Sequence, residues 1–325
     1  MKPGRVAELP IVRRFPELGT LPRTQLGSYP TPIDRVRLRD GRLLLLKRDD
    51  RSADPLGGNK VRGLEWLLGA VRAGDRVLTV GSTGSTHALL TAYYARRLGA
   101  EPVVVRWGQQ MNDAAQRVDA AVRDVSNVID AWTVPSAFLV AALLRLRPGT
   151  RWIPAGGSTP MAVLGHVNAG LELAEQVDRG ACDAPERVVV PLGTGGTAAG
   201  LALGFRIAGL PTRVVAVRVV PRIVGRAGRV LRLAHSTAAL IERMCHQSLP
   251  RVRPDDVQVE QGFYGGGYGR PLQLPADDDV LGTAGIALDD TYSRKAFAAA
   301  LALGSRGTLL WLTFDGRLLQ HSGSF

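Results

Sequence analysis

Short apolar runs recur along the chain and alternate with stretches in which apolar residues follow helical spacing. The runs consist mainly of valine and leucine, a composition typical of strands that are buried on both faces of a sheet. We therefore predict strands at residues 43–46, 77–80, 103–105, 188–190, 214–217 and 309–312.

Between these runs, leucine and valine follow helical spacing over residues 64–71 and again over residues 163–171. A further helix is predicted over residues 231–244, followed by a glycine-rich loop. Strands that alternate with helices predict an α/β protein with a mostly parallel sheet. Breaks at Pro148-Gly149 and Gly156-Gly157 indicate a crossover between two lobes, and a small ligand is expected between them.

A length of 325 residues favours two domains, and 45% apolar with 22% charged residues is typical of a soluble globular protein. The two cysteines, Cys182 and Cys245, are too few for a disulfide framework or a zinc site. No apolar run approaches the length of a membrane helix. We therefore expect a protein of the reducing cytoplasm that does not enter a membrane.

The net charge of +12 raises the question of a nucleic-acid surface. The arginines are scattered along the chain, however, and no zinc-finger spacing, RNP-type aromatic motif or basic helix accompanies them. We therefore expect no nucleic-acid partner. The charge should instead favour anionic small ligands, among them a cofactor that carries a phosphate.

Lysine is rare in this chain. The lysines among the 41 basic residues are Lys2, Lys47, Lys60 and Lys295. A lysine that persists in an arginine-rich chain is a candidate for chemistry that arginine cannot perform, since its amine can lose a proton and attack a carbonyl. Lys60 ends the motif Gly57-Gly58-Asn59-Lys60, whose two glycines let a ligand approach the backbone closely. We predict that Lys60 holds pyridoxal phosphate as a Schiff base. Spacing alone favours the alternative, a surface lysine after a turn.

Two further glycine-rich loops, residues 81–87 and 193–197, each follow a predicted strand and open a helix. Both combine serine or threonine with backbone N–H groups at a helix N-terminus, which is an anion site. A Rossmann dinucleotide site would need an acidic residue after the next strand, which instead ends in Val217-Arg218-Val219. Taken singly, each loop is an ordinary strand-to-helix turn. The three loops together indicate one phosphorylated cofactor and one carboxylate substrate.

These segments resemble the D-cysteine desulfhydrase and 1-aminocyclopropane-1-carboxylate deaminase family, pyridoxal-phosphate enzymes of the tryptophan synthase β fold (fold type II). The resemblance runs in order from about residue 20 to residue 313. The segments that carry it are Lys47-Arg48-Asp49-Asp50, the Lys60 motif with Val61-Arg62, residues 153–170, residues 193–197, Gly267-Tyr268-Gly269 and residues 288–296.

The resemblance implies two lobes, each a mostly parallel sheet flanked by helices. We expect a large cofactor-binding domain of residues 1–52 and 161–325. Residues 53–160 are expected to form a small domain that carries the loop for the substrate carboxylate. Relatives are commonly homodimers, so a homodimer is expected by analogy.

The resemblance also implies roles for individual residues. Lys60 matches the Schiff-base lysine that moves the Cα proton, and Ser85 matches the serine that binds the substrate carboxylate. Tyr268 and Tyr292 match tyrosines on the substrate side of the cofactor; without the resemblance we would interpret them as packing residues. The further cofactor contacts are expected from Asn59, Thr86, Gly193, Thr194, Gly195, Gly196, Thr197, Ser293 and Thr313.

Ser293 matches the position that faces the pyridine nitrogen of the cofactor. A carboxylate there would keep the nitrogen protonated and the ring a stronger electron sink. Members that open a cyclopropane ring resemble one another in carrying glutamate at this position. A hydroxyl leaves the nitrogen neutral, which suffices for β-elimination because a leaving group takes the electrons. Thr313 falls at another position where threonine resembles the desulfhydrases.

The chain departs from the family pattern around the expected site. Gly84-Ser85-Thr86-His87 stands where the family reads Gln-Ser-Asn-His, so the shorter Thr86 replaces the asparagine that bonds the cofactor's ring oxygen. Gly63 stands where relatives often carry a lysine that contacts the phosphate, and Phe314-Asp315 replaces a glycine pair. His87 keeps its place, and we interpret it as a packing residue.

We expect a lyase that converts a small amino acid to a keto acid and ammonia by α,β-elimination, with D-cysteine as the first candidate substrate. The enzymatic alternatives are deamination of 1-aminocyclopropane-1-carboxylate, β-replacement and racemisation. The altered loop at residues 84–87 motivates the last two. The non-enzymatic alternative is a homologue that binds the cofactor without turnover.

Overall fold

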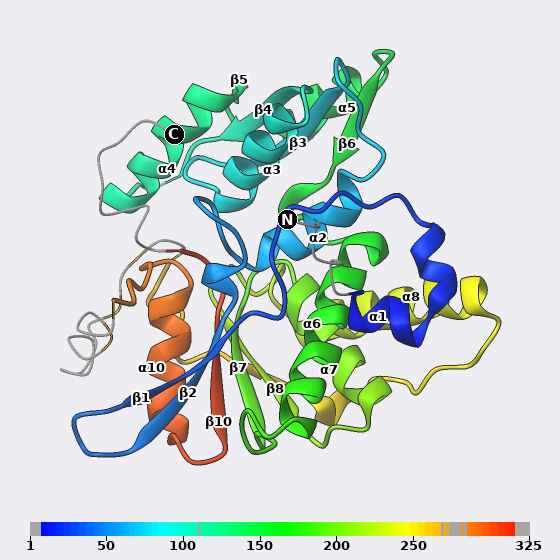
Figure 1. Ribbon diagram of the computed structural model, residues 1–325. Coiled ribbons are helices and arrows are strands. Elements are labelled where there is room, and N and C mark those ends of the chain that lie inside the picture. Colours follow the sequence, from blue (N-terminus) through cyan, green and yellow to red (C-terminus); the bar gives the residue numbers. More distant parts are fainter. Residues whose placement is uncertain are drawn as a thin grey trace, which may run out of the picture.

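Two lobes, each built on one β-sheet, make up the molecule in the computed structural model, which describes residues 8–109, 111–267, 270, 272, 281 and 285–315 (Figure 1). The small lobe holds a four-stranded sheet in the order β5-β4-β3-β6, and the large lobe a six-stranded sheet in the order β1-β2-β10-β7-β8-β9. The strands are β1 Ile33–Arg37, β2 Leu43–Arg48, β3 Arg76–Ser82, β4 Glu101–Trp107, β5 Asn127–Ala131, β6 Thr150–Ile153, β7 Arg187–Leu192, β8 Arg213–Arg218, β9 Val257–Glu260 and β10 Thr308–Leu312.

Helices cover both faces of each sheet, which gives the α/β fold expected from the sequence (Figure 1). In the large lobe, α10 lies on one face and α6, α7 and α8 lie on the other. The helices are α1 Pro10–Arg14, α2 Asn59–Leu67, α3 Thr86–Arg97, α4 Asp113–Val125, α5 Val134–Leu144, α6 Pro160–Asp178, α7 Gly196–Ala208, α8 Ala227–Cys245 and α10 Ser293–Leu303, with short 3₁₀ turns at Pro16–Thr20, Asp49–Arg51, Ala155–Gly157 and Pro254–Asp256. None of the described helices is long and apolar enough to cross a bilayer.

Alternate side chains of the central strands enter different cores, as the two-residue period of a strand requires. Val188 and Val190 of β7 pack with α6, α7 and α8, whereas Val189 packs with α10 on the opposite face. In the small lobe, Val77 joins the core under α2, α3 and α4, and Leu78 joins the core under α5. Burial on both faces explains why these strands are continuous apolar runs in the sequence.

All six strands predicted from apolar runs are confirmed, and the four that were not predicted, β1, β5, β6 and β9, are the edge strands of the two sheets. Edge strands have one neighbour and more exposed side chains, so their sequences mix polar with apolar residues. Strand β1 reads Ile-Asp-Arg-Val-Arg and pairs antiparallel with β2, while the other strand pairs are parallel.

The helices predicted around residues 163–171 and 231–244 are confirmed as parts of α6 and α8. The first predicted helix ends earlier than its apolar pattern, because α2 stops at Leu67 and Val71 lies beyond it. Gly69 follows this end, where a Cβ would lie 2.1 Å from the carbonyl oxygen of Pro22. The chain therefore turns where a second backbone segment crosses it.

A buried network of charged side chains fixes α2 to the large lobe. Arg62 of α2 donates to Asp49 at 2.7 and 2.9 Å and to Glu172 of α6 at 2.9 and 3.0 Å. Lys47 of β2 donates to the same Glu172 at 2.6 Å. Burial by itself would raise the pKa of Glu172, but Arg62 and Lys47 outweigh it and lower the pKa to about 2. Glu172 is therefore ionised, and the paired charges hold α2 in one position.

The domain limits, residues 1–52 with 161–325 and residues 53–160, stay a proposal. Strands β3 to β6 form one sheet, and the other six strands form the second. Helix α2 lies between the lobes, because it packs against α6 of one lobe and α3 of the other.

Candidate active site

Lys60 lies in the first turn of α2, which the backbone enters through two glycines. Gly58 has a φ of 148°, and a Cβ there would lie 2.7 Å from the carbonyl oxygen of Thr313. A Cβ on Gly57 would lie 2.1 Å from the carbonyl oxygen of Asp50. The two glycines therefore let the chain pass between neighbouring backbone segments, and this passage delivers Lys60 to the junction of the lobes.

Lys60 differs from the other two described lysines in its hydrogen bonding. Lys47 donates three bonds of 2.6 Å, and Lys295 donates bonds of 2.7 and 2.8 Å to two backbone carbonyls. The single bond recorded for Lys60 is longer, 3.3 Å from Nζ to the carbonyl oxygen of Gly156. Loss of hydration lowers the pKa of Lys60 to about 8. Lys60 is thus the described lysine whose amine is best able to react.

Two buried histidines lie near Lys60. His87 Nε2 is 3.2 Å from the carbonyl oxygen of Pro154. Burial, and then the charge of Lys60, lower the pKa of His87 to about 3. Burial, followed by the charges of Lys60 and Arg62, lowers the pKa of His166 well below its ordinary value. Both rings are therefore neutral near pH 7, and Lys60 is the basic group of this region.

The loop of residues 81–87 leads from β3 into α3. Ser85 is the N-cap of α3, and its Oγ accepts a hydrogen bond of 3.3 Å from the backbone N–H of Ala88. Gly84 has a φ of 72°, and a Cβ there would lie 2.6 Å from the Cβ of Ala115. The positive φ and this crowding both favour glycine at position 84. First-turn N–H groups lack intrahelical acceptors, so the start of α3 at Ser85 and Thr86 is a candidate anion site.

The loop of residues 193–197 leads from β7 into α7 and forms the second such site. Gly195, with a φ of 95°, precedes the helix. Asn59 Nδ2 donates to Thr197 Oγ1 at 2.7 Å, which ties the Lys60 loop to this one. The hydroxyls of Ser158 and Thr194 are hydrogen-bonded to each other. Three chain segments that are distant in sequence are therefore held together at the start of α7.

Arg229, in the first turn of α8, is a residue of this region that the sequence did not single out. Its Nε donates to the carbonyl oxygen of Thr194 at 3.0 Å. Burial and the neighbouring Arg232 and Arg226 lower its pKa. Gly63 has no side chain to supply a second cation, and a Cβ there would make a tight contact of 3.1 Å with the carbonyl oxygen of Ala162. Arg229 had no distinguishing signal, since arginine is common throughout the chain.

One cavity of about 470 Å³ between the lobes brings most of the predicted residues together. Ser293 is buried at the start of α10 and is not among the residues that line this cavity. Tyr268 lies outside the described residues. The predicted residues that line the cavity are Asn59, Lys60, Ser85, Thr86, Gly193, Thr194, Gly195, Gly196, Thr197, Tyr292 and Thr313.

The cavity also has an apolar wall that the sequence did not predict. The small lobe supplies Trp107 at the end of β4 and two residues of α5. The large lobe supplies residues from the segment after β8. No motif unites these positions, because strand ends that are distant in sequence meet here only in the fold. The apolar residues are Trp107, Val134, Phe138, Val220, Pro221 and Val224.

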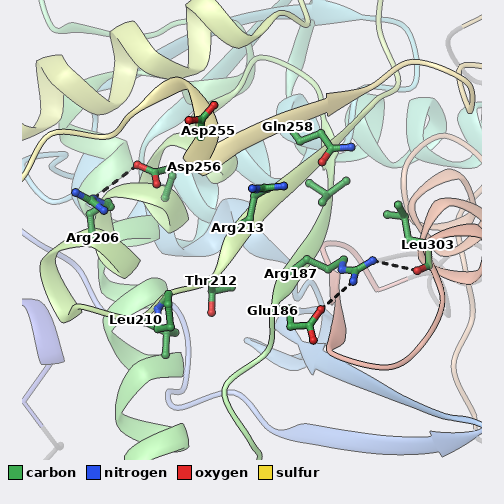
Figure 2. Close-up of a pocket in the computed structure, with 13 residues that line it drawn as sticks. Glu186, Arg187, Arg206, Leu210, Thr212, Arg213, Asp255, Asp256, Gln258 and Leu303 are labelled. Carbon is green, nitrogen blue, oxygen red and sulfur yellow. Dashed lines mark hydrogen bonds and ion pairs between the residues drawn. The ribbon is translucent and has the colours of Figure 1, made fainter.

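A second cavity, of about 560 Å³, opens at the amino-terminal ends of β7, β8 and β9 (Figure 2). Its charged side chains largely pair with one another and with the backbone. Arg206 Nε lies 3.7 Å from Asp256, and Arg187 contacts Glu186 at 3.0 Å and the carbonyl oxygen of Leu303 at 3.0 Å. Although it is larger, this cavity contains no lysine among its described residues and no helix N-terminus of the Ser85 or Gly195 kind.

Comparison with known proteins gives one family match, described as "Pyridoxal-phosphate dependent enzyme", over residues 24–309. The chain is 36% identical to nocardicin C-9' epimerase of Nocardia uniformis subsp. tsuyamanensis, over 94% of each chain. It is 31% identical to D-cysteine desulfhydrase of Klebsiella pneumoniae (strain 342), over 87% of this chain and 89% of the relative.

Solved structures of the same architecture support the two-lobed fold. The structure described as an ACC deaminase homologue superposes with a TM-score of 0.76 at 27% identity, covering 94% of this chain and 98% of that one. A threonine deaminase superposes with a TM-score of 0.61 at 24% identity, covering 95% of this chain and 97% of that one. The second likeness concerns the fold alone.

Proposed function

Because the chain belongs to the family of pyridoxal-phosphate dependent enzymes, we propose that Lys60 holds pyridoxal 5'-phosphate and removes the Cα proton of an amino acid. The observation that carries this proposal is the position of the Lys60 amine, with a pKa of about 8. It lies in the same cavity as the starts of two helices, α3 and α7. One anion site suits the phosphate of the cofactor, and the other suits the carboxylate of the substrate.

The residues present fit the cofactor. Ser293 Oγ is buried, and the interaction described for it is with the carboxylate of Asp289. Burial raises the pKa of the adjacent Asp289 and the Ser293 hydroxyl opposes that rise, but this carboxylate already accepts three backbone N–H groups. Because Asp289 keeps these three backbone donors, the Ser293 hydroxyl can turn from it to a group that enters the site. The resemblance puts the pyridine nitrogen of the cofactor at this position, and a hydroxyl can donate a hydrogen bond to that nitrogen.

When bound, the cofactor supplies an electron-withdrawing ring that stabilises the charge left on Cα after proton loss. The backbone of residues 193–197 and the Arg229 guanidinium would hold its phosphate, with Thr197 kept in place by Asn59. Ser85 and the start of α3 would hold the substrate carboxylate. Lys60 Nζ would then take the Cα proton, because a pKa of about 8 leaves roughly a tenth of the amine neutral at pH 7 and about half at pH 8.

After proton removal, we favour loss of a β-substituent, which gives a keto acid and ammonia as in D-cysteine desulfhydrase. Ser293 supports this outcome, since a neutral partner for the ring nitrogen suffices when a leaving group takes the electrons. The relative from Klebsiella pneumoniae also bears the name of that activity.

Epimerisation at Cα is the second candidate, and the 36% identity with an epimerase favours it. It requires that a proton return to the face of Cα opposite Lys60. Ser85 and Tyr292 are the hydroxyl-bearing residues of the expected catalytic set that line the cavity. The same initial proton removal by Lys60 serves both outcomes.

The test is to incubate the cofactor-loaded protein in D₂O with D- and L-cysteine, D- and L-alanine, and 1-aminocyclopropane-1-carboxylate. Keto acid, ammonia and sulfide from cysteine would support elimination, and inversion with deuterium at Cα of alanine would support epimerisation. Ammonia from the cyclopropane would overturn the preference drawn from Ser293. The absence of Cα exchange with every amino acid would contradict the proposed function.

A further inference from the structure

The apolar wall of the cavity lies at a distance from the Lys60 amine. Lys60 contacts Gly156, just after β6, whereas Trp107 ends β4. In the sheet order β4-β3-β6, these two points are separated by two strand spacings, roughly 10 Å. In the large lobe, Val220 follows β8, one strand further than the loop after β7. The cavity therefore extends from a polar end near Lys60 to an apolar end.

The apolar end is partly exposed in the protein as it stands. Phe138 is 43% exposed and Val134 is 44% exposed, and Ile223, next to Val224, is 78% exposed. Trp107 and Phe138 stack on each other, with ring centroids 6.1 Å apart and planes at 27°. A stacked aromatic pair that is partly open to solvent at the mouth of a cavity is typical of a binding surface for an apolar group.

Charged side chains do not contribute to the apolar end of the cavity. Among the described lining residues, the charged side chains are Lys60 and Arg229, and Arg229 is bonded to the loop of residues 193–197. Gln109 is the polar neighbour of Trp107, but its amide already donates to the carbonyl oxygen of Thr83 at 2.6 Å. The wall therefore offers contact area rather than directed hydrogen bonds.

We propose that the substrate is an amino acid whose side chain ends in an aromatic or other bulky apolar group, held between Phe138 and Trp107 on one lobe and Val224 on the other. This inference rests on the proposed function, because it places Cα beside Lys60. A substrate as short as cysteine reacts at the polar end and leaves the apolar wall in water. Since burial of apolar area lowers free energy, the extended substrate is preferred.

The experiment compares two substrates with the same reacting part, cysteine and S-benzylcysteine, as both enantiomers and with the cofactor-loaded protein. Elimination from S-benzylcysteine breaks the Cβ–S bond and, with water, gives phenylmethanethiol, pyruvate and ammonium. Alanine and phenylalanine form a second pair without a leaving group, followed by Cα deuterium exchange. We expect kcat/KM or exchange to be roughly 10- to 100-fold higher for the larger member of each pair.

Two alanine variants on α5 test whether the preference for the larger substrate depends on the apolar wall. Phe138→Ala should remove most of the preference for the larger substrate, so that the ratio of kcat/KM between the two members of each pair falls towards one. Leu139→Ala is the control, because Leu139 is the next residue of α5, is 63% exposed and does not line the cavity. Phe138→Leu should restore part of the preference, and an unchanged cofactor absorbance checks that each variant is folded.

Equal rates for the two members of both pairs, or equal losses in Phe138→Ala and Leu139→Ala, would overturn the inference and leave the proposed function intact. If no amino acid shows Cα exchange although Lys60 carries the cofactor, the proposed function fails instead. The preference for the larger amino acid is then measured as a difference in equilibrium dissociation constants, from titrations that follow the cofactor absorbance. Tighter binding of S-benzylcysteine supports the inference, and equal binding overturns it.

Discussion

Two cavities lie at opposite ends of the parallel strands of the large lobe. They differ in whether their polar groups already face partners within the protein. At the amino-terminal ends, Arg206 and Arg187 face Asp256 and Glu186 within the same cavity. At the carboxyl-terminal ends, Lys60 makes one long hydrogen bond and two helices begin. In the amino-terminal cavity these two arginines therefore already face acidic side chains, whereas the inter-lobe cavity presents an amine and two helix N-termini to a ligand.

Helix α7 connects the two regions and shows why the ends of the strands are not equivalent. Its first residue, Gly196, lines the inter-lobe cavity, and Arg206 in its last turn lines the other. A helix presents N–H groups and partial positive charge at its start, and carbonyls and partial negative charge at its end. The start of α7 therefore favours an anion in the inter-lobe cavity. The partial negative charge at the end of α7 already lies beside Arg206 in the amino-terminal cavity. Ligands of open α/β sheets bind at the carboxyl ends of strands for this reason.

Replacement of Lys60 should produce the largest difference between the two cavities. Lys60→Ala removes both the covalent attachment of the cofactor and the base, and we expect a loss of Cα exchange of roughly 10²- to 10⁴-fold. Borohydride reduction followed by peptide mapping should find the phosphopyridoxyl group on Lys60 in the parent protein and no such adduct in the variant.

Arg187→Ala in the amino-terminal cavity is the control for Lys60→Ala, and it should leave exchange within about twofold because its partners lie outside the inter-lobe cavity. A full rate in Lys60→Ala would refute the assignment of the base. An equal loss in Arg187→Ala would show that the larger cavity takes part in the reaction.

The pH dependence of cofactor attachment should be the next largest effect. Only the neutral amine attacks an aldehyde, and desolvation lowers the pKa of Lys60 to about 8 from an ordinary value of 10.5. The rate of attachment to cofactor-free protein should therefore rise about tenfold per pH unit below pH 8 and level off above it. A rate that still rises tenfold per unit through pH 9.5 would contradict the lowered pKa.

Unfolding is a poorer probe of the Lys60 pKa. Burial also lowers the pKa of Lys295 to about 8. Between pH 8 and 10.5 the unfolded chain binds more protons than the folded one at both lysines, so both raise the free energy of unfolding with pH. Stopped-flow absorbance of cofactor attachment is specific to Lys60 and avoids this overlap.

Arg229 should contribute a smaller, measurable share of cofactor affinity. Arg229→Gln removes the cation beside the loop of residues 193–197, and we expect the Kd for pyridoxal phosphate to rise about tenfold, which corresponds to about 1.4 kcal/mol. Arg206→Gln, at the other end of α7, should leave this Kd unchanged. Fluorescence titration of cofactor-free protein measures both values, and a similar change in the two variants would remove the distinction between the cavities.

The central strands of both sheets could be predicted from sequence, and the edge strands could not. Strands such as β7, with Val188 to Val190 buried on both faces, are written as continuous apolar runs. Strands β1 and β9 have one neighbour each and mixed sequences, so their identity depends on the partner strand that tertiary structure supplies. The expected cytoplasmic location and homodimer stay predictions.

The residues of the candidate site also divide into those that the sequence could predict and those that it could not. Lys60, Ser85 and the loop of residues 193–197 sit in local motifs, because glycine and a helix start are needed within a few residues of each other. Arg229 and the aromatic pair Trp107 and Phe138 carry no local motif, and only the packing of the lobes brings them to the cavity. Contacts made by the fold rather than by adjacent residues have no signature in a single sequence.

The smallest expected effect comes from a comparison of two hydroxyls, those of Ser293 and Thr212. Ser293→Ala removes a buried hydroxyl whose described partner, Asp289, keeps three backbone N–H donors, so the cofactor-free protein should lose less than about 1 kcal/mol of stability. The Kd for pyridoxal phosphate should nevertheless rise about fivefold, as the loss of one hydrogen bond of about 1 kcal/mol predicts.

Thr212→Val in the amino-terminal cavity is the matched opposite of Ser293→Ala. Thr212 Oγ1 donates to the carbonyl oxygen of Pro185 at 2.6 Å, and its loss leaves that buried acceptor without this partner. We expect the free energy of unfolding to fall by about 1–3 kcal/mol with no change in cofactor affinity. Thermal melts and cofactor titrations of the two variants should therefore move in opposite patterns. If Ser293→Ala instead destabilised the cofactor-free protein as much as Thr212→Val does, the interaction of its hydroxyl with Asp289 would be needed by the fold, and the argument that this hydroxyl is available to the cofactor would fail.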